Sequence, residues 1–115
     1  MKQERRRFAR VHQPFDAKYR LYNEIGESWR QIATLNLSAG GVRFKSADLI
    51  EVGTELEVQV KVPNSSEPLL LRARVKWSQL QASGVAENGV EFTKISAEQQ
   101  KRLDELVRFL LKKMM

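Results

Sequence analysis

The strongest constraint on the fold is an alternation of apolar and polar residues, with a period of two, that recurs along most of the chain. In its clearest stretch four aliphatic residues alternate with polar ones, at Leu56, Val58, Val60 and Val62. Successive side chains of a β-strand point to opposite faces, so such stretches predict strands that bury one face. We expect strands over residues 15–22, 29–37, 42–45, 55–62, 69–77 and 89–92, and a loop or irregular hairpin over residues 78–88.

The alternation ends near Ser96, where a helical pattern begins. Ser96 and Gln99 form a capping box, in which the two side chains satisfy free backbone amides at a helix start. Apolar residues then recur at helical spacing, at Leu103, Leu106, Val107, Leu110, Leu111 and Met114. We predict an amphipathic helix over residues 96–114 that packs on the strands or closes one end of them. Its apolar stripe is expected in the core, with a dimer or partner surface as the alternative.

Six short strands followed by one helix predict a mostly β protein, a six-stranded antiparallel β-barrel with an amphipathic C-terminal α-helix. A chain of 115 residues is long enough for one domain with a single core. We expect residues 14–115 to form this domain. Residues 1–13 show neither the two-residue period of a strand nor the spacing of an amphipathic helix. They are expected to form a flexible arginine-rich arm.

The composition excludes several classes of function. The chain has no cysteine, and its one histidine, His12, has no clustered carboxylates beside it, so neither a metal site nor thiol catalysis is expected. Ser38 lacks a base partner and no phosphate-binding glycine loop is present, so we expect no enzyme and no cofactor. No apolar run approaches the roughly 18 residues of a membrane span, and no secretory signal is visible. A cytoplasmic location is expected.

Positive charge is concentrated at the N-terminus. Residues 1–10 hold five basic residues and one acidic residue, which supplies +4 (5 − 1) of the formal net charge of +6. Proteins that bind long nucleic acids usually spread their positive charge over a face or groove. The concentrated charge favours a small anionic partner, and we expect no DNA or RNA partner.

The charge of this arm comes mainly from Arg5, Arg6, Arg7 and Arg10. Guanidinium groups bind phosphate through paired hydrogen bonds, recognise the O6/N7 edge of guanine and stack on flat bases. In an extended chain Arg6 and Arg10 lie about 13 Å apart, so they could reach separate parts of one dinucleotide. An arginine run alone is more often a solvated tail.

A second segment with unusual composition, residues 36–41, separates two predicted strands. Asn36 and Ser38 place polar side chains on the same face, and Gly40 and Gly41 allow a ligand to approach the backbone closely. The asparagine amide both donates and accepts hydrogen bonds, which suits a purine edge. Alone, this segment is more often a tight turn.

Together the two segments resemble the paired signature of the PilZ domain family, RxxxR followed by [D/N]xSxxG. Here the signature is Arg6-x-x-x-Arg10 and Asn36-x-Ser38-x-x-Gly41. Further similarities are the doubled glycine, the strand that ends at Trp77, the strand over residues 89–92 and the amphipathic C-terminal helix. The resemblance implies a PilZ-type barrel that binds cyclic di-GMP, a bacterial second messenger, without transforming it.

The resemblance also implies roles for particular residues. Arg6 and Arg10 would clamp guanine and phosphate groups, with further contacts from Arg5 and Arg7. Asn36, Ser38 and Gly41, with Gly40 beside them, would line the pocket for a guanine. Trp77 resembles an aromatic residue that stacks on guanine in some members, although a core position at a strand end is equally compatible with its place in the pattern. Asn36 stands where aspartate is commoner, so it supplies no negative charge to guanine.

These features suggest how a signal would pass. Four arginines repel one another and should keep the arm mobile, whereas a ligand with two phosphates would pin it to the barrel. The output would pass to an unknown effector protein, and we expect a monomer or weak dimer. Two alternatives are a ligand-independent PilZ-fold adaptor that recognises a protein and a small basic barrel that binds nucleic acid.

Overall fold

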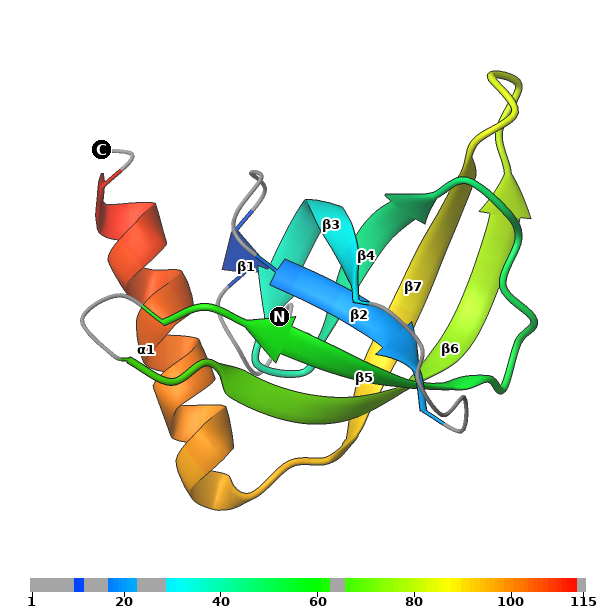
Figure 1. The fold of residues 1–115 in the computed structure, drawn as a ribbon. Helices are drawn as coiled ribbons and strands as arrows, with labels where there is room; N and C mark the ends of the chain where they lie inside the picture. The colour runs from blue at the N-terminus through cyan, green and yellow to red at the C-terminus, as the bar shows by residue number, and fades with distance from the viewer. Residues whose placement is uncertain (1–9, 12–16, 23–28, 63–65, 114–115) are drawn as a thin grey trace, which may run out of the picture.

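The computed structural model describes residues 10–11, 17–22, 29–62 and 66–113. These residues form seven strands and one helix (Figure 1). The elements are β1 (Arg10–Val11), β2 (Ala17–Leu21), β3 (Arg30–Ser38), β4 (Gly41–Ser46), β5 (Glu55–Val60), β6 (Leu69–Leu80), β7 (Ala86–Lys94) and α1 (Ala97–Lys113). Of the expected arm over residues 1–13, only β1 falls within the described residues.

Every strand pair is antiparallel, and the pairs form a ring. The ring passes from β2 through β5, β6, β7, β4 and β3, and β3 pairs with β2 again. The short β1 adds a seventh strand beside β3. The prediction of a mostly β, six-stranded antiparallel barrel with a C-terminal helix is therefore confirmed.

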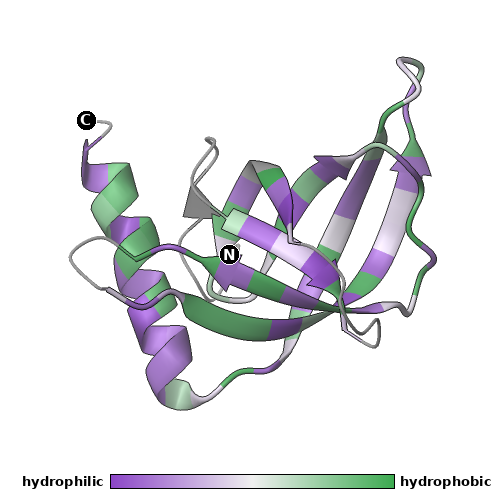
Figure 2. Cartoon of the chain, viewed as in Figure 1, coloured by the Kyte–Doolittle hydropathy of each residue, from purple (hydrophilic) through white to green (hydrophobic). Residues whose placement is uncertain are grey.

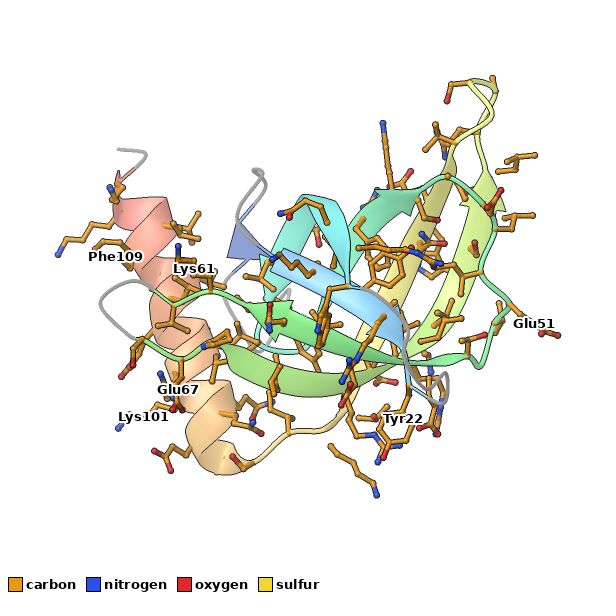
Figure 3. All side chains as sticks on the ribbon, in the orientation of Figure 1. Tyr22, Glu51, Lys61, Glu67, Lys101 and Phe109 are labelled. Carbon is orange, nitrogen blue, oxygen red and sulfur yellow. The ribbon has the colours of Figure 1, made fainter. Side chains whose placement is uncertain are left out.

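The core fills the interior of this ring and continues under the helix. Alternate residues of the strands are buried, which produces the alternating bands of hydropathy in Figure 2. The rings of Tyr19 and Phe44 lie 5.0 Å apart, and α1 contributes Leu103, Leu106 and Val107. Each such side chain stabilises the fold by about 1.5–3 kcal/mol on burial. Phe109, by contrast, points away from the barrel (Figure 3) and is exposed.

The start of α1 shows the expected capping box. The backbone amide of Gln99 donates to Ser96 Oγ at 3.0 Å, and the amide of Ser96 donates to Gln99 Oε1 at 3.0 Å. The Gln99 side chain also donates to the backbone oxygen of Leu70 at 3.2 Å, which ties the helix start to β6. The cap therefore both begins the helix and fixes it to the barrel.

The prediction of a loop or irregular hairpin over residues 78–88 is wrong in its extent. Strand β6 continues to Leu80 and β7 begins at Ala86, so the connection is shorter and the two strands project beyond the barrel (Figure 1). Gln79 and Leu80 are both exposed there. The buried side chains of this stretch are the small Ala86 and the polar Asn88, so the apolar alternation by which a strand is recognised in a sequence is missing.

Three register shifts interrupt the strand pairing inside the barrel, and one of them, between Arg72 and Ala73, lies early in β6. In β3 a register shift lies between Thr34 and Asn36, and in β6 another lies between Val75 and Trp77. A bulge adds one residue to a strand, so side chains beyond it point to the opposite face from the one that strict alternation assigns. The side chain of Trp77 therefore points away from the core, whereas that of Val75 is buried in it.

One buried polar side chain joins three parts of the barrel. Asn88, which has no exposed surface, donates to the backbone oxygen of Phe44 at 3.3 Å and to Ser46 Oγ at 3.0 Å. Its Oδ1 accepts from Ser78 Oγ at 2.6 Å, and that hydroxyl accepts from the amide of Ile50 at 3.2 Å. The Asn88 amide thus connects β4, β6 and β7 with the segment that precedes β5.

We predict that Asn88→Ala lowers the free energy of unfolding by about 2–3 kcal/mol, because it leaves buried partners without hydrogen bonds. Urea unfolding followed by circular dichroism measures this change. The matched control is Gln79→Ala on the same hairpin, where an exposed side chain should change stability by less than about 0.5 kcal/mol. Equal stability of the two variants would contradict a structural role for the Asn88 amide.

Candidate functional site

The turn between β3 and β4 contains the residues that sequence reasoning selected. The side chains of Asn36 and Ser38 are each only 2% exposed. Ser38 Oγ accepts a hydrogen bond from the backbone amide of Gly40 at 3.1 Å, which holds the turn in shape. Ser38 also pairs directly with Gly41 across the two strands. The structure therefore brings these four residues together in one ordered turn.

Gly41 is required here by close packing. A Cβ atom at this position would lie 2.2 Å from the backbone oxygen of Val90, far inside van der Waals contact. Any side chain would push β4 away from β7, with which Gly41 pairs at Glu91.

Strand β1 lies against the same turn. Arg10 pairs with Ser38 and Val11 pairs with Leu37, so the second arginine of the predicted arm signature lies beside the second signature (Figure 1). At Arg10 this contact is made by the backbone. The other predicted arm residues, Arg5, Arg6 and Arg7, lie outside the described residues.

Trp77 reaches this region through the register of four strands. Asn36 in β3 pairs with Arg43 in β4, Arg43 pairs with Gly89 in β7, and Gly89 pairs with Trp77 in β6. The four residues form one row across the barrel. We call this surface, together with the adjoining turn, the outer face; its residues are Asn36, Ser38, Gly40, Gly41, Arg43, Trp77 and Gly89.

The indole of Trp77 lies against the backbone of Gly89. A Cβ atom at Gly89 would lie 2.2 Å from Trp77 Nε1 and 2.4 Å from Cε2, so only glycine admits the ring in this position. Trp77 keeps 38% of its surface exposed and does not belong to the core. Of the two interpretations of Trp77, the structure thus supports a surface aromatic, on which a flat base could stack.

Sequence reasoning missed Arg43, Glu87 and Gly89. Arg43 Nε donates to Glu87 Oε2 at 3.2 Å, and the Arg43 guanidinium lies 5.7 Å from the centre of the Trp77 ring. The glycine within a predicted strand was the one available signal, because such a glycine often marks a close approach. Nothing local linked Arg43 to Trp77, since only strand pairing brings them together.

The outer face is distinct from a hollow bordered by other described residues. That hollow has a volume of about 620 Å³ and lies at the opposite end of the β3–β4 hairpin, next to Arg30, Gln31, Lys45 and Ser46. In the described ranges, histidine and acidic side chains form no group of three that could hold a metal ion. Over the same ranges, α1 lacks the length and apolar character needed to cross a membrane.

Solved structures share this fold over most of the chain. The Bacillus subtilis inhibitor of motility MotI/DgrA is 23% identical, with a TM-score of 0.73 over 98% of this chain and 55% of that one. Escherichia coli YcgR in complex with c-di-GMP is 17% identical, with a TM-score of 0.69 over 96% of this chain and 48% of that one. This chain thus spans about half the length of these two proteins.

The PilZ domain of Escherichia coli YcgR with c-di-GMP gives a match of domain to domain. It is 14% identical, with a TM-score of 0.67 over 96% of this chain and 95% of that one. At such identities the similarity shows the fold alone.

The sequence comparison is more decisive for the family than these structural matches. Among curated protein sequences no match is found. The model of the PilZ domain matches residues 4–109, a span that holds the arginine arm, the β3–β4 turn and most of α1. The resemblance inferred from the two signatures is thereby confirmed, and the chain belongs to the PilZ domain family.

Proposed function

We propose that this chain is a receptor for cyclic di-GMP, which it binds on the outer face without transforming it. The observation that carries the proposal is the pairing of Arg10 with Ser38, because it joins the two signatures of the family at one place. The complex of YcgR with c-di-GMP supports the choice of ligand for this fold. No catalytic residue, cofactor or metal is part of the proposal.

The chemistry of the outer face suits the two kinds of group in the ligand. Arg6 and Arg10, with Arg5 and Arg7 beside them, would bind the phosphates and guanine edges through charge-assisted hydrogen bonds. Gly40 and Gly41 would let one guanine lie close to the backbone, and the indole of Trp77 would stack on a base. An exposed aromatic face can contribute about 1–3 kcal/mol per stacked base.

Asn36 and Ser38 would act after a local rearrangement. Both side chains are nearly buried in this structure, so a ligand reaches them only if their surroundings shift. Strand β1 is two residues long, and so short a pairing costs little to displace. We propose that the ligand replaces contacts around β1 and orders the arm in a new position, which an effector protein then recognises.

The distribution of aromatic residues disfavours the nucleic-acid-binding alternative. A barrel that binds single strands presents several aromatic side chains along one exposed strand face. Here Tyr19 and Phe44 are buried against each other. The exposed aromatic residues of the described segments lie on separate elements: Tyr22 in the turn after β2, Trp77 in β6 and Phe109 in α1.

We predict that isothermal titration detects saturable binding of cyclic di-GMP at micromolar concentrations, with no binding of GTP or cyclic AMP. Those two nucleotides offer one base each and cannot occupy the arm and the outer face together. The protein should be checked for its folded state by circular dichroism before titration. A folded protein that gives no signal at tens of micromolar cyclic di-GMP contradicts the proposed function.

We predict that Arg6→Ala and Arg10→Ala each weaken cyclic di-GMP binding roughly 10- to 150-fold, because each removes a charge-assisted contact. Lys101→Ala is the matched control, since it removes one positive charge from the exposed surface of α1 (Figure 3). The control should bind like the wild type within about twofold. If all three variants lose affinity equally, the arm contributes only net charge and is not the clamp.

We predict that Trp77→Ala and Gly89→Ala both weaken binding, the first by removing the indole and the second by displacing it. The loss for Trp77→Ala should be roughly 5- to 150-fold, the value of one stacked base. Trp29→Phe serves as the control, because Trp29 contacts Arg20, at 4.3 Å, rather than the outer face. Unchanged affinity in Trp77→Ala would remove the indole from the proposed site.

A further inference from the structure

Arg43 lies at the centre of the outer face. It pairs with Asn36 on one side and with Gly89 on the other. The indole of Trp77 lies against the backbone of Gly89. The Arg43 side chain is 46% exposed, and its guanidinium lies 5.7 Å from the centre of the Trp77 ring. A cation at this distance is within range of the ring quadrupole.

The guanidinium of Arg43 is held in one orientation by Glu87. Arg43 Nε and Nη2 both donate to Glu87 Oε2, and Gln81 Nε2 donates to the other oxygen, Oε1, at 3.1 Å. The Glu87 side chain is only 13% exposed, so its own position is restricted. Because surface ion pairs add little stability, the main effect of this contact is on the direction of the guanidinium.

The contact with Glu87 leaves one edge of the guanidinium available. The group carries five N–H donors in a planar fork, and Glu87 accepts from Nε and Nη2. Glu87 is the one hydrogen-bond acceptor that the described residues offer Arg43, so the Nη1/Nη2 edge keeps two parallel donors. Such an edge matches two adjacent acceptors, which guanine presents as O6 and N7.

We infer that Arg43 determines specificity for guanine, by donating from its Nη1/Nη2 edge to O6 and N7 of the guanine that stacks on Trp77. The inference rests on the proposed function, since it concerns the same site. An adenine in this place would present an amino donor where guanine presents O6, and one hydrogen bond of the pair would be lost. Arg43 is thus a contact beyond the two signatures of the family.

The test is isothermal titration of the wild type, Arg43→Ala, Arg43→Lys and Lys45→Ala with two ligands. The ligands are cyclic di-GMP and its 7-deaza analogue, in which N7 is replaced by carbon. Lys45 is the matched control, because it is an exposed cation on the same face of β4, two residues from Arg43. Thermal unfolding of each variant confirms that the barrel is intact.

We expect Arg43→Ala to bind cyclic di-GMP roughly 5- to 150-fold more weakly than the wild type, the value of one paired base contact. Arg43→Lys should lose nearly as much, because a single ammonium cannot supply the paired donors. Lys45→Ala should stay within about twofold. The wild type should also bind the 7-deaza analogue more weakly than cyclic di-GMP, and this loss should be smaller in Arg43→Ala, in which the proposed N7 contact is already missing.

Three results would overturn the inference. One is an Arg43→Ala variant that binds cyclic di-GMP as tightly as Lys45→Ala does. Another is an Arg43→Lys variant that retains full affinity, because a positive charge alone would then account for the contact. The third is an Arg43→Ala variant that discriminates against the 7-deaza analogue as strongly as the wild type does, because N7 would then be recognised elsewhere. Failure of the proposed function is different, since the wild type itself would then not bind cyclic di-GMP.

Discussion

The structure depends above all on strand β3 being paired along both edges at its end. At Leu37 and Ser38 the backbone pairs with β1 on one side and with β4 on the other, while the start of β3 pairs with β2. These pairs close the barrel and bring the end of the arginine arm to the turn at Gly40. Strand β3 therefore takes part both in the closure of the sheet and in the assembly of the candidate site.

Much of this arrangement could be predicted from local pattern. The strands over the core, the capping box at Ser96 and the two signatures are each visible within a few residues. The row from Asn36 to Trp77 could not be predicted, because it depends on pairing between distant strands. Bulges also change the face of a side chain: strict alternation places Trp77 with Val75 in the interior, yet the bulge between them turns it outward.

Charge on the rest of the barrel is largely balanced within the sheet. Arg20 pairs with Glu57 at 2.8 Å, Lys76 pairs with Glu91 at 3.4 Å, and Arg72 pairs with Glu55. Paired charges of this kind have weak fields beyond a Debye length of about 8 Å at physiological salt. Residues 1–10 carry an excess of +4 (5 − 1), so under the proposed function a dianion would be attracted mainly by this segment.

The bulge before Trp77 has an evolutionary consequence. Substitutions on the outer face alter single contacts, but a change that removed the bulge while the length of β6 stayed the same would restore strict alternation and turn the indole toward the interior. The barrel would keep its strand order while the surface lost its aromatic platform. Loss of this one bulge is thus a short route by which a lineage could retain the scaffold and abandon the proposed ligand.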